Sequence, residues 1–277
     1  MLARRSFLLL LLGAGCARDA VLEDPEAPHG HLISVPTEPT VPPAPRSEVL
    51  AAEIEVLGLR LGTLESSRCS LRGTTQIETH LAPIPLVNAL HRSGGDARTV
   101  LGPASVPLFS EYHIEDGDLL RHYRVQYRTG AFEYVYDNGG RAKNHGLEAV
   151  PEGAPAHDLH SALSLLRAWR PRLDERGYFY IVVGRRLWRA DVKFAGPEVI
   201  SAQGGPRLTQ RIDGTSVRLW QSEESDPRRF SLWLSEDPDR VPLRLVADSS
   251  VGEVRLTLTS REQGEGDCRK LRANAAR

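Results

Sequence analysis

From Ser47 onward, apolar and polar residues alternate with a period of two over much of the chain. Such alternation is typical of a β-strand with one buried face. The clearest run, 187–194, places four apolar residues on one face and three charged residues on the other: Trp188, Ala190, Val192 and Phe194 against Arg189, Asp191 and Lys193. Similar runs lie at 121–127 and 254–259. Residues 178–183 are apolar on both faces, which indicates a central strand or one that lines a pocket.

Turn signals separate these runs. Asp116-Gly117, Asn138-Gly139 and Asp213-Gly214 are dipeptides that favour tight β-hairpins. Short strands joined by tight turns indicate an antiparallel meander and not β-α-β units. We therefore predict a mainly β protein, an antiparallel meander of about ten strands that forms a barrel or half-barrel.

One segment has the period of a helix. Along residues 158–169, five apolar side chains share a stripe: Leu159, Ala162, Leu163, Leu166 and Trp169. Asp158 or His157 suits the start as a cap, and Pro171 closes the end. We expect this amphipathic helix to pack on the open face of the half-barrel or to plug its mouth. A second, shorter helix is expected between Pro83 and His91.

The first sixteen residues have the three parts of an export signal. Arg4 and Arg5 precede an apolar run that ends at Leu12, and small residues follow up to Cys16. The run is too short to span a bilayer, which takes about 20 apolar residues. Small residues directly before a cysteine resemble the bacterial lipobox, in which the cysteine sulfur carries a diacylglyceryl group. We predict a lipoprotein signal peptide at 1–15 and lipidation at Cys16. An ordinary signal peptide, cut near Ala14 or Ala17, is the alternative.

Lipidation and charge together define the expected surroundings. Several acyl chains on one residue anchor a protein stably to a membrane. Ala17 follows the cysteine where lipoproteins kept at the inner membrane commonly have Asp, so the resemblance favours the outer membrane, facing the periplasm. The 35 Lys and Arg residues nearly balance 36 Asp and Glu residues, which argues against a nucleic-acid partner. The expected partners are the membrane, through the anchor, and a lipid or an envelope protein.

Composition divides the rest of the chain into three parts. Seven of the 19 prolines fall between residues 17 and 46, which predicts a lipidated, Pro-rich flexible tether over 16–47. Residues 48–262 form the predicted single β-rich domain. Residues 263–277 form a basic C-terminal tail.

The chain has three cysteines, an odd number that needs an explanation in an exported protein. If Cys16 carries lipid, Cys69 and Cys268 remain as an even pair. In an oxidising compartment such a pair can form a disulfide, and antiparallel barrels often bring their first and last strands together. Two unpaired thiols are the alternative, because sequence does not give the separation of the sulfur atoms.

Two groups of side chains are candidates for a site. His157 and His160 lie three residues apart at the predicted helix, and imidazoles suit Zn²⁺, but no third ligand is evident. If the barrel is open, four aromatic residues line a cavity that would bind a ligand: Trp188, Phe194, Tyr178 and Tyr180. Packing in the core is the alternative for these four.

Motifs of known chemistry are missing from the sequence. It has no Gly-x-Ser-x-Gly elbow, no His-Glu-x-x-His, no P-loop and no dinucleotide fingerprint. We therefore predict no catalytic residues, no cofactor, no established metal site and a non-enzymatic function.

Three stretches in order carry a resemblance: 53–62, Asp158-Leu-His-Ser161 through Arg167, and Leu232-Trp-Leu-Ser235-Glu-Asp237-Pro-Asp-Arg240-Val-Pro242. Together they resemble a family of exported bacterial proteins, domain of unknown function 3108, over about residues 48–260. The resemblance implies an antiparallel β fold in the cell envelope and no assigned reaction. The expected architecture is also similar to the half-barrel of lipoprotein carriers, although fold does not determine function.

Three functions are compatible with these features. The first is an envelope lipoprotein that binds a hydrophobic or amphipathic ligand, or an envelope partner, in a β half-barrel. The second is an assembly scaffold with a filled core, and the third is an enzyme acting on envelope polymers. An open apolar cavity of roughly 300 Å³ or more favours the first, and a filled interior favours the second.

Overall fold

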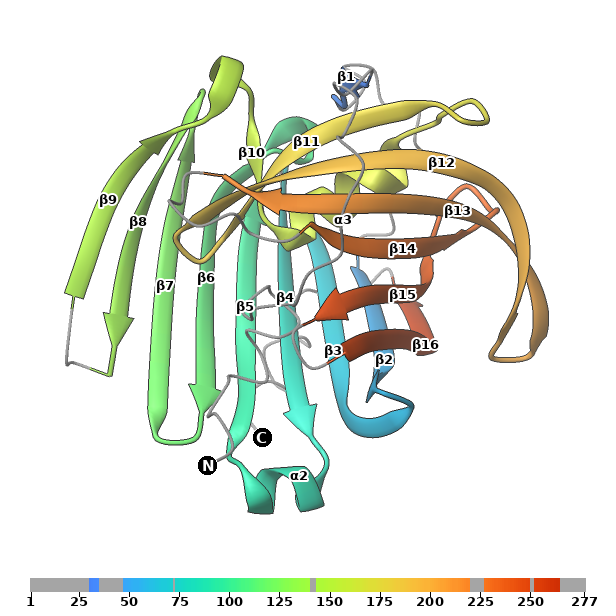
Figure 1. The fold of residues 1–277 in the computed structure, drawn as a ribbon, viewed down its shortest axis with the longest axis horizontal. Coiled ribbons are helices and arrows are strands. Elements are labelled where there is room, and N and C mark those ends of the chain that lie inside the picture. The colour runs from blue at the N-terminus through green and yellow to red at the C-terminus, as the bar shows by residue number, and fades with distance from the viewer. Residues whose placement is uncertain are drawn as a thin grey trace.

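The computed structural model describes residues 30–34, 47–71, 73–139, 143–219, 227–249 and 252–264. Cys16, Cys268, the predicted signal peptide and most of the predicted tail lie outside these residues. A single sheet of sixteen strands dominates the described part (Figure 1). Its strands are β1 His31–Leu32, β2 Ser47–Val56, β3 Leu59–Leu71, β4 Thr74–Pro83, β5 Ser93–Leu101, β6 Pro107–Asp116, β7 Leu119–Arg128, β8 Ala131–Asn138, β9 Lys143–Ala149, β10 Ala156–His157, β11 Arg176–Val183, β12 Arg186–Ala202, β13 Gly205–Arg218, β14 Arg228–Ser235, β15 Pro242–Ser249 and β16 Gly252–Gly264.

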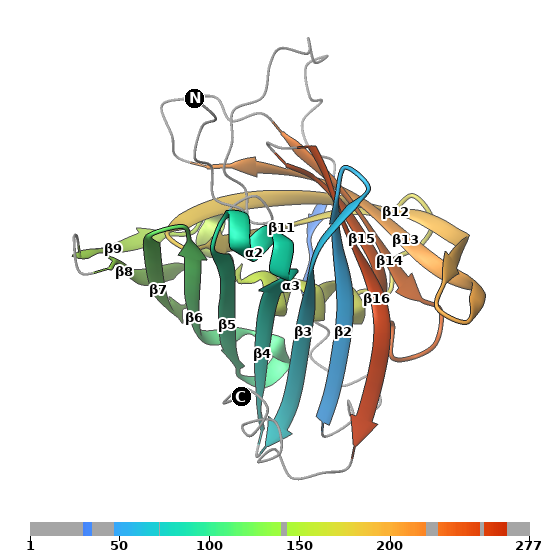
Figure 2. The ribbon, with the colours of Figure 1, turned by 90° about the horizontal axis from the view of Figure 1, so that it is seen from below.

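The sheet consists of two antiparallel series joined at one seam. Strands β2 to β9 pair consecutively, as do β11 to β16, and β16 pairs with β2 to join the two series. The short strands β1 and β10 pair with β11 in parallel. The sheet curls strongly without closing, because β9 at one end does not pair with β1 at the other. Figure 2 shows the resulting barrel-like shape from below.

The predicted antiparallel β fold is confirmed, but about ten strands is an undercount. The runs named from the sequence do not include β4 or β5. Thr79 on β4 and Thr99 on β5 lie among apolar neighbours and hydrogen-bond to the helix inside the curl. These polar inner positions interrupt the apolar face that the period-two pattern requires.

The helix α3, Leu159–Ala168, lies inside the curl between the two series of strands (Figure 1). Asp158 caps it: the Asp158 carboxylate accepts from the Ser161 backbone N–H, and the Ser161 hydroxyl oxygen accepts from the Asp158 N–H, both at 2.8 Å. Its buried face differs from the expected stripe, since Leu159 is exposed and Leu165 is buried. The shorter helix α2, Pro85–Leu90, and two single 3-10 turns, Pro103–Ser105 and Pro151–Gly153, complete the helical elements. None of the described helices has the length and apolar character needed to cross a membrane.

Three apolar clusters hold the curl together. The first joins α3 to β11–β14, where Leu165 and Leu166 pack with Phe179, Ala190 and Ile212. The second lies on the inner faces of β2, β4, β6, β7 and β16. The third joins β7 and β8 to β10–β12 through Val125, Phe132, Tyr180, Val182 and Leu187. Phe179 and Tyr180 thus belong to different clusters, which confirms that β11 is buried on both faces.

Part of the predicted tether belongs to the folded domain. His31 and Leu32 pair with Gly177 and Tyr178 of β11, and Ile33 is only 1% exposed within the first cluster. A Cβ on Gly177 would lie 2.4 Å from Ile33 Cγ1, so the close approach depends on this glycine. The tether prediction is therefore wrong for residues 30–34. The apolar residues Leu32 and Ile33 bury themselves, although the surrounding segment is rich in proline.

A buried ionic cluster fixes the C-terminal end of α3. Glu48 of β2 is 2% exposed and accepts hydrogen bonds from Arg167 Nη1 at 2.8 Å and from Arg261 Nε at 2.9 Å. Arg167 also donates to the backbone oxygen of Asp239, whose carboxylate pairs with Arg261 at 2.5 Å. Burial alone would raise the pKa of Glu48, but the two guanidinium groups lower it below its usual range. This cluster connects the helix, the first long strand, the last strand and the turn at 236–241.

Candidate functional site

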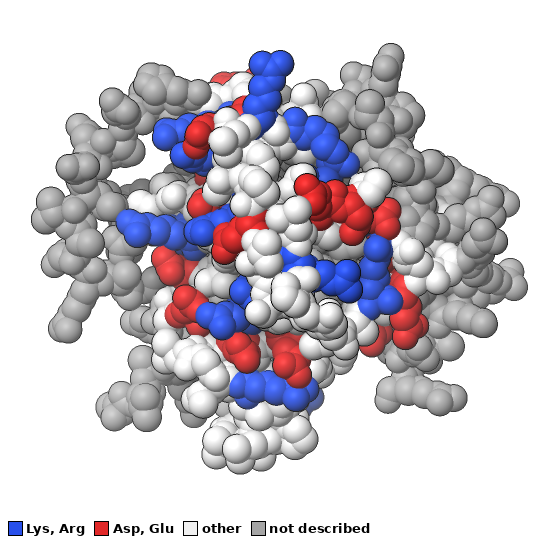
Figure 3. Space-filling view, turned by 90° about the vertical axis from the view of Figure 1, so that its right-hand side faces the viewer, with Lys and Arg blue, Asp and Glu red and all other residues white. Residues whose placement is uncertain are grey.

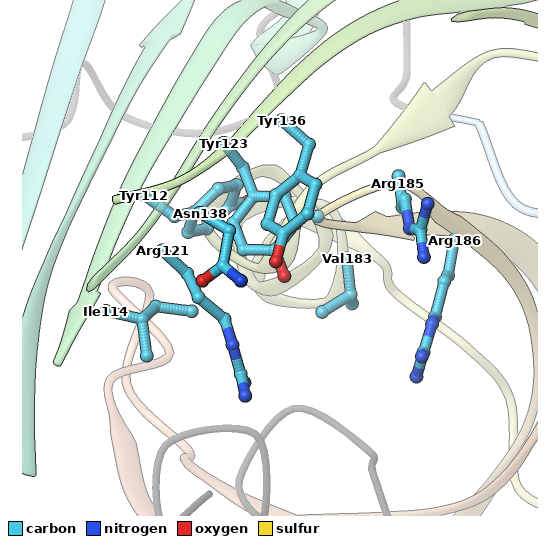
Figure 4. A pocket seen from close by; sticks show the side chains of 10 residues that line it. Tyr112, Ile114, Arg121, Tyr123, Tyr136, Asn138, Val183, Arg185 and Arg186 are labelled. Atoms are coloured by element: carbon cyan, nitrogen blue, oxygen red, sulfur yellow. The ribbon is translucent and has the colours of Figure 1, made fainter. Parts of the chain in front are cut away.

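A pocket of about 250 Å³ opens on the concave face of the sheet (Figure 4). Strands β6, β7 and β8 form its wall, and the turn between β11 and β12 lies across it. Ten residues line the pocket: Tyr112, Ile114, Arg121, Tyr123, Tyr136, Asn138, Val183, Gly184, Arg185 and Arg186. The wall residues alternate along their strands, so each strand contributes two positions of the same face.

The turn approaches the wall closely because of one glycine. Gly184 has a φ of +64°, and a Cβ at this position would lie 2.9 Å from the Tyr123 ring. Any other residue would therefore suffer both backbone strain and a clash with Tyr123. This turn places Arg185 and Arg186 opposite the tyrosines.

Aromatic rings make up much of the wall. Tyr123 and Tyr136 stack with ring centroids 4.7 Å apart and an angle of 26° between their planes. The Arg185 guanidinium carbon lies 5.5 Å from the Tyr136 centroid, within the range of a cation–π interaction. The pocket thus has π-faces and arginine side chains next to one another.

The pocket has more positive than negative charge. Arg121 pairs with Asp116 at 3.3 Å, and Asp116 is also 2.8 Å from His91. Arg185 and Arg186 have no carboxylate of the described residues within 4.0 Å. Burial lowers the pKa of the half-buried Arg186 guanidinium, and the charges of Arg185 and Arg121 act in the same direction. A guanidinium nevertheless stays protonated in proteins, so among the described residues this cation lacks a partner of opposite charge.

The aromatic residues predicted to line a cavity lie elsewhere. Trp188, Phe194 and Tyr180 are buried in the packed core, and Tyr178 packs beside the third cluster with its hydroxyl donating to Glu152 at 2.8 Å. None of the four lines the pocket. The face that carries Phe194 is covered by α3, which fills the space that an open half-barrel would have left.

His157 and His160 do not converge on a common point. His160 Nδ1 is 2.7 Å from the Thr99 hydroxyl and its Nε2 is 2.8 Å from the Thr79 hydroxyl, so both ring nitrogens are engaged. The Thr99 hydroxyl in turn donates to the buried Asp158 carboxylate. His157 is buried and packs edge-on against Phe179, with centroids 6.3 Å apart. The two histidines serve the packing of α3, and in the described part of the chain they belong to no group of three potential metal ligands.

Cys69 lies in β3 opposite Ser47, whose other neighbour across the sheet is Gly264 of β16. Cys268 follows Gly264 by four residues but lies outside the described residues. This register is compatible with a disulfide between Cys69 and Cys268. The disulfide stays a prediction.

The sequence contains one signal for the pocket, at Arg121. Arg121 shares a strand face with Tyr123 and Val125, and both of these are buried. A charged residue on a buried face indicates a functional or paired position. The sequence alone does not predict that Arg185 and Arg186 line the pocket, because their position depends on where a turn distant in sequence crosses the sheet.

The family described as protein of unknown function DUF3108 matches residues 74–259. The chain belongs to this family. A solved β-barrel-like protein of the domain of unknown function DUF1849 from Brucella abortus has the same fold: the TM-score is 0.52 at 8% identity, over 81% of this chain and 100% of that chain. A protein with a YmcC-like fold from Bacteroides fragilis matches with a TM-score of 0.38 at 7% identity, over 80% of this chain and 99% of that one. No curated protein matches the chain.

The resemblance motifs can now be placed in this DUF3108 protein. Asp158 and Ser161 form the helix cap, Arg167 joins the buried ionic cluster, and the Ser235 hydroxyl oxygen accepts from the Val241 N–H at 2.7 Å. All of these residues secure α3 or the turn beside it, and none lines the pocket. The residues of these two motifs therefore stabilise the fold.

The surface shows no broad field of one sign on the face drawn in Figure 3, where basic and acidic side chains interleave. This distribution fits the near-zero net charge of the chain.

Proposed function

We propose that this protein is an envelope lipoprotein that binds a small anionic ligand with a planar or apolar part in the arginine–tyrosine pocket. The observation that carries the proposal is the charge of Arg185 and Arg186, which no described carboxylate balances. Arg186 is half-buried and Arg185 is exposed, so solvent screens both charges in part. An anionic ligand would still supply the partner of opposite charge that the half-buried Arg186 lacks among the described residues. The stacked tyrosines offer a surface for the planar or apolar part.

The size of the pocket narrows the class of ligand. Sites for drug-sized molecules occupy about 300–1,000 Å³. At about 250 Å³ and with arginines in its wall, this pocket suits a headgroup-sized carboxylate or phosphate ester better than a long acyl chain. Packed side chains fill the space between β11–β14 and α3, so this space leaves no room for an acyl chain.

The chemistry of the lining supports binding without catalysis. The ten lining residues include no carboxylate, histidine, serine or cysteine. Burial raises the pKa of the Tyr112 and Tyr123 hydroxyls above their ordinary value, so both keep their protons near neutral pH. Arginine does not act as a base in proteins. The pocket thus offers hydrogen-bond donors and π-faces but no general base.

Thermal unfolding of the full chain, purified in detergent, tests the proposal with three probes: phenyl phosphate, phenol and inorganic phosphate. We expect phenyl phosphate to raise the midpoint most, because it alone meets both the arginines and the rings. Arg186→Gln should weaken its binding by about tenfold or more, since a hydrogen bond to a charged group is worth about 1.5–3 kcal/mol. Arg207→Gln, on an exposed arginine of β13, is the matched control and should bind like wild type.

A scaffold function is the second candidate, because α3 fills much of the interior of the curl. It predicts that none of the three probes shifts the unfolding midpoint. The same measurement therefore separates the two functions.

A further inference from the structure

The outer faces of β6 and β7 carry a cluster of three potential metal ligands. Glu111 and His113 alternate along β6 with Tyr112, so they project away from the pocket on the other side of the sheet. His122 of β7 is the cross-strand partner of His113. The two imidazole rings stack with centroids 4.1 Å apart and 18° between their planes.

The ligand atoms of the cluster already lie near one another. One atom each of Glu111, His113 and His122 lies within 4.8 Å of the others. His122 Nε2 is 2.6 Å and His113 Nε2 is 3.7 Å from the same oxygen, Glu111 Oε1. Solvent reaches all three side chains, which are 17%, 56% and 28% exposed for Glu111, His113 and His122. We propose that Glu111, His113 and His122 form a binding site for Zn²⁺ that leaves one coordination position open to solvent.

The donor set and spacing fit this ion. Two histidines and one carboxylate are a common three-residue ligand set for Zn²⁺, whereas Mg²⁺ and Ca²⁺ prefer oxygen ligands alone. Ligand atoms about 2.0–2.1 Å from a tetrahedral ion lie about 3.3 Å from each other. The two distances to Glu111 Oε1 bracket this value. The two rings, now stacked 18° from parallel, must turn so that one nitrogen of each points at the ion.

Neighbouring strands add negative charge around the cluster. Asp96 of β5 is the cross-strand partner of His113, and Asp137 of β8 is the partner of His122. Asp96 and Asp137 thus flank the pair of imidazoles on the outer face at this level. Carboxylates beside a histidine–zinc site orient the rings and favour the cation.

Arg124 competes with the metal. Its Nε donates to Glu111 Oε1 at 2.8 Å, and His122 Nε2 lies at hydrogen-bond distance from the same oxygen. Binding of the ion must break the bond from Arg124 or share this oxygen, and it must displace the proton on His122 Nε2 to solvent.

The test is a calorimetric titration of the untagged full chain in detergent with ZnCl₂, together with the visible spectrum after addition of Co²⁺. We expect one ion per chain, the d–d bands of a low-symmetry Co²⁺ site, and no binding of MgCl₂. His113→Ala and His122→Ala should each weaken Zn²⁺ binding by at least about 10–100-fold. This is the typical loss when a residue that only supports a metal ligand is removed, and removal of a ligand itself should cost no less. Arg124→Gln should tighten it.

His145→Ala is the matched control, since His145 is exposed on β9 outside the cluster. Wild-type affinity in His113→Ala and His122→Ala, or an equal loss in His145→Ala, would overturn the proposal. So would the absence of a Co²⁺ spectrum in the wild type. His113 is the most exposed ligand, so its variant keeps the test valid even if His122→Ala does not fold. The outcome does not depend on the arginine–tyrosine pocket.

Discussion

At the scale of single residues, buried ionisable groups make the fold sensitive to acid. His157 is 2% exposed, its Nδ1 has no hydrogen-bond partner among the described residues, and burial lowers its pKa from 6.5 to about 4. The nearby Asp158 carboxylate opposes this shift only in part. The folded protein therefore holds this imidazole neutral at a pH where the unfolded chain has it protonated.

Between about pH 6.5 and pH 4 the unfolded state binds one proton more than the folded state at His157, so the free energy of unfolding falls as the pH falls. The slope from this residue is about 1.4 kcal/mol per pH unit, or roughly 3 kcal/mol over the window. In His157→Gln we expect urea unfolding at pH 7 and pH 4.5 to show a smaller acid loss than in wild type. His145→Gln, an exposed control, should keep the wild-type loss. An unchanged acid loss in His157→Gln would show that other groups cause it.

At the scale of elements, α3 is held in the curl as much by charge as by apolar packing. Glu48 lies between Arg167 and Arg261, and its carboxylate is the negative centre of the cluster. Loss of one partner from a buried ion pair leaves the other charges uncompensated. The cluster therefore controls whether the helix stays docked.

Glu48→Gln should lower the free energy of unfolding by about 3 kcal/mol, since the largely buried Arg167 guanidinium loses its carboxylate partner, while Arg261 keeps Asp239. The comparison is Glu53→Gln on the same strand, which removes an exposed ion pair with Arg60 at 3.0 Å and should cost at most about 1 kcal/mol. Urea denaturation measures both. Equal losses in the two variants would contradict a special role for Glu48.

The elements also show how far sequence reasoning reaches. The alternating strand at 187–194 and the capped helix at 158–169 follow from local patterns and are found where they were predicted. Thr79 and Thr99 interrupt the apolar inner faces of β4 and β5, and their polarity is explained only by His160 on a helix far away in sequence. The sequence did not predict the candidate pocket for a similar reason, because Arg186 lies near Tyr123 only through the long-range curl of the sheet.

At the scale of the whole molecule, a lipid on Cys16, as we propose, would lie closer to the folded domain than the predicted tether over 16–47 implied. The folded domain begins near Gly30, so 13 residues separate it from Cys16. Even a fully extended chain of this length spans no more than roughly 45 Å. We propose that the pocket works close to a membrane surface.

This arrangement requires the lipid on Cys16. Metabolic labelling with a radioactive fatty acid should label the wild-type chain, and Cys16→Ala should lose essentially all of the label because the acceptor sulfur is gone. Cys69→Ala is the control and should keep its label. Equal labelling of wild type and Cys16→Ala would end the lipoprotein proposal.

The central claim is that a small anion binds between the arginines and the stacked tyrosines. The tyrosines outside the pocket serve as controls for this claim. All seven tyrosines lie in the described residues; Tyr112, Tyr123 and Tyr136 line the pocket, and four lie outside it: Tyr127, Tyr134, Tyr178 and Tyr180. The most direct test is NMR of the full chain with ¹³C-labelled tyrosine rings during titration with phenyl phosphate. We predict saturable shifts that are largest for Tyr123 and Tyr136 and that disappear in Arg186→Gln. No shifts at all, or shifts equally large at Tyr178 and Tyr180, would contradict the account.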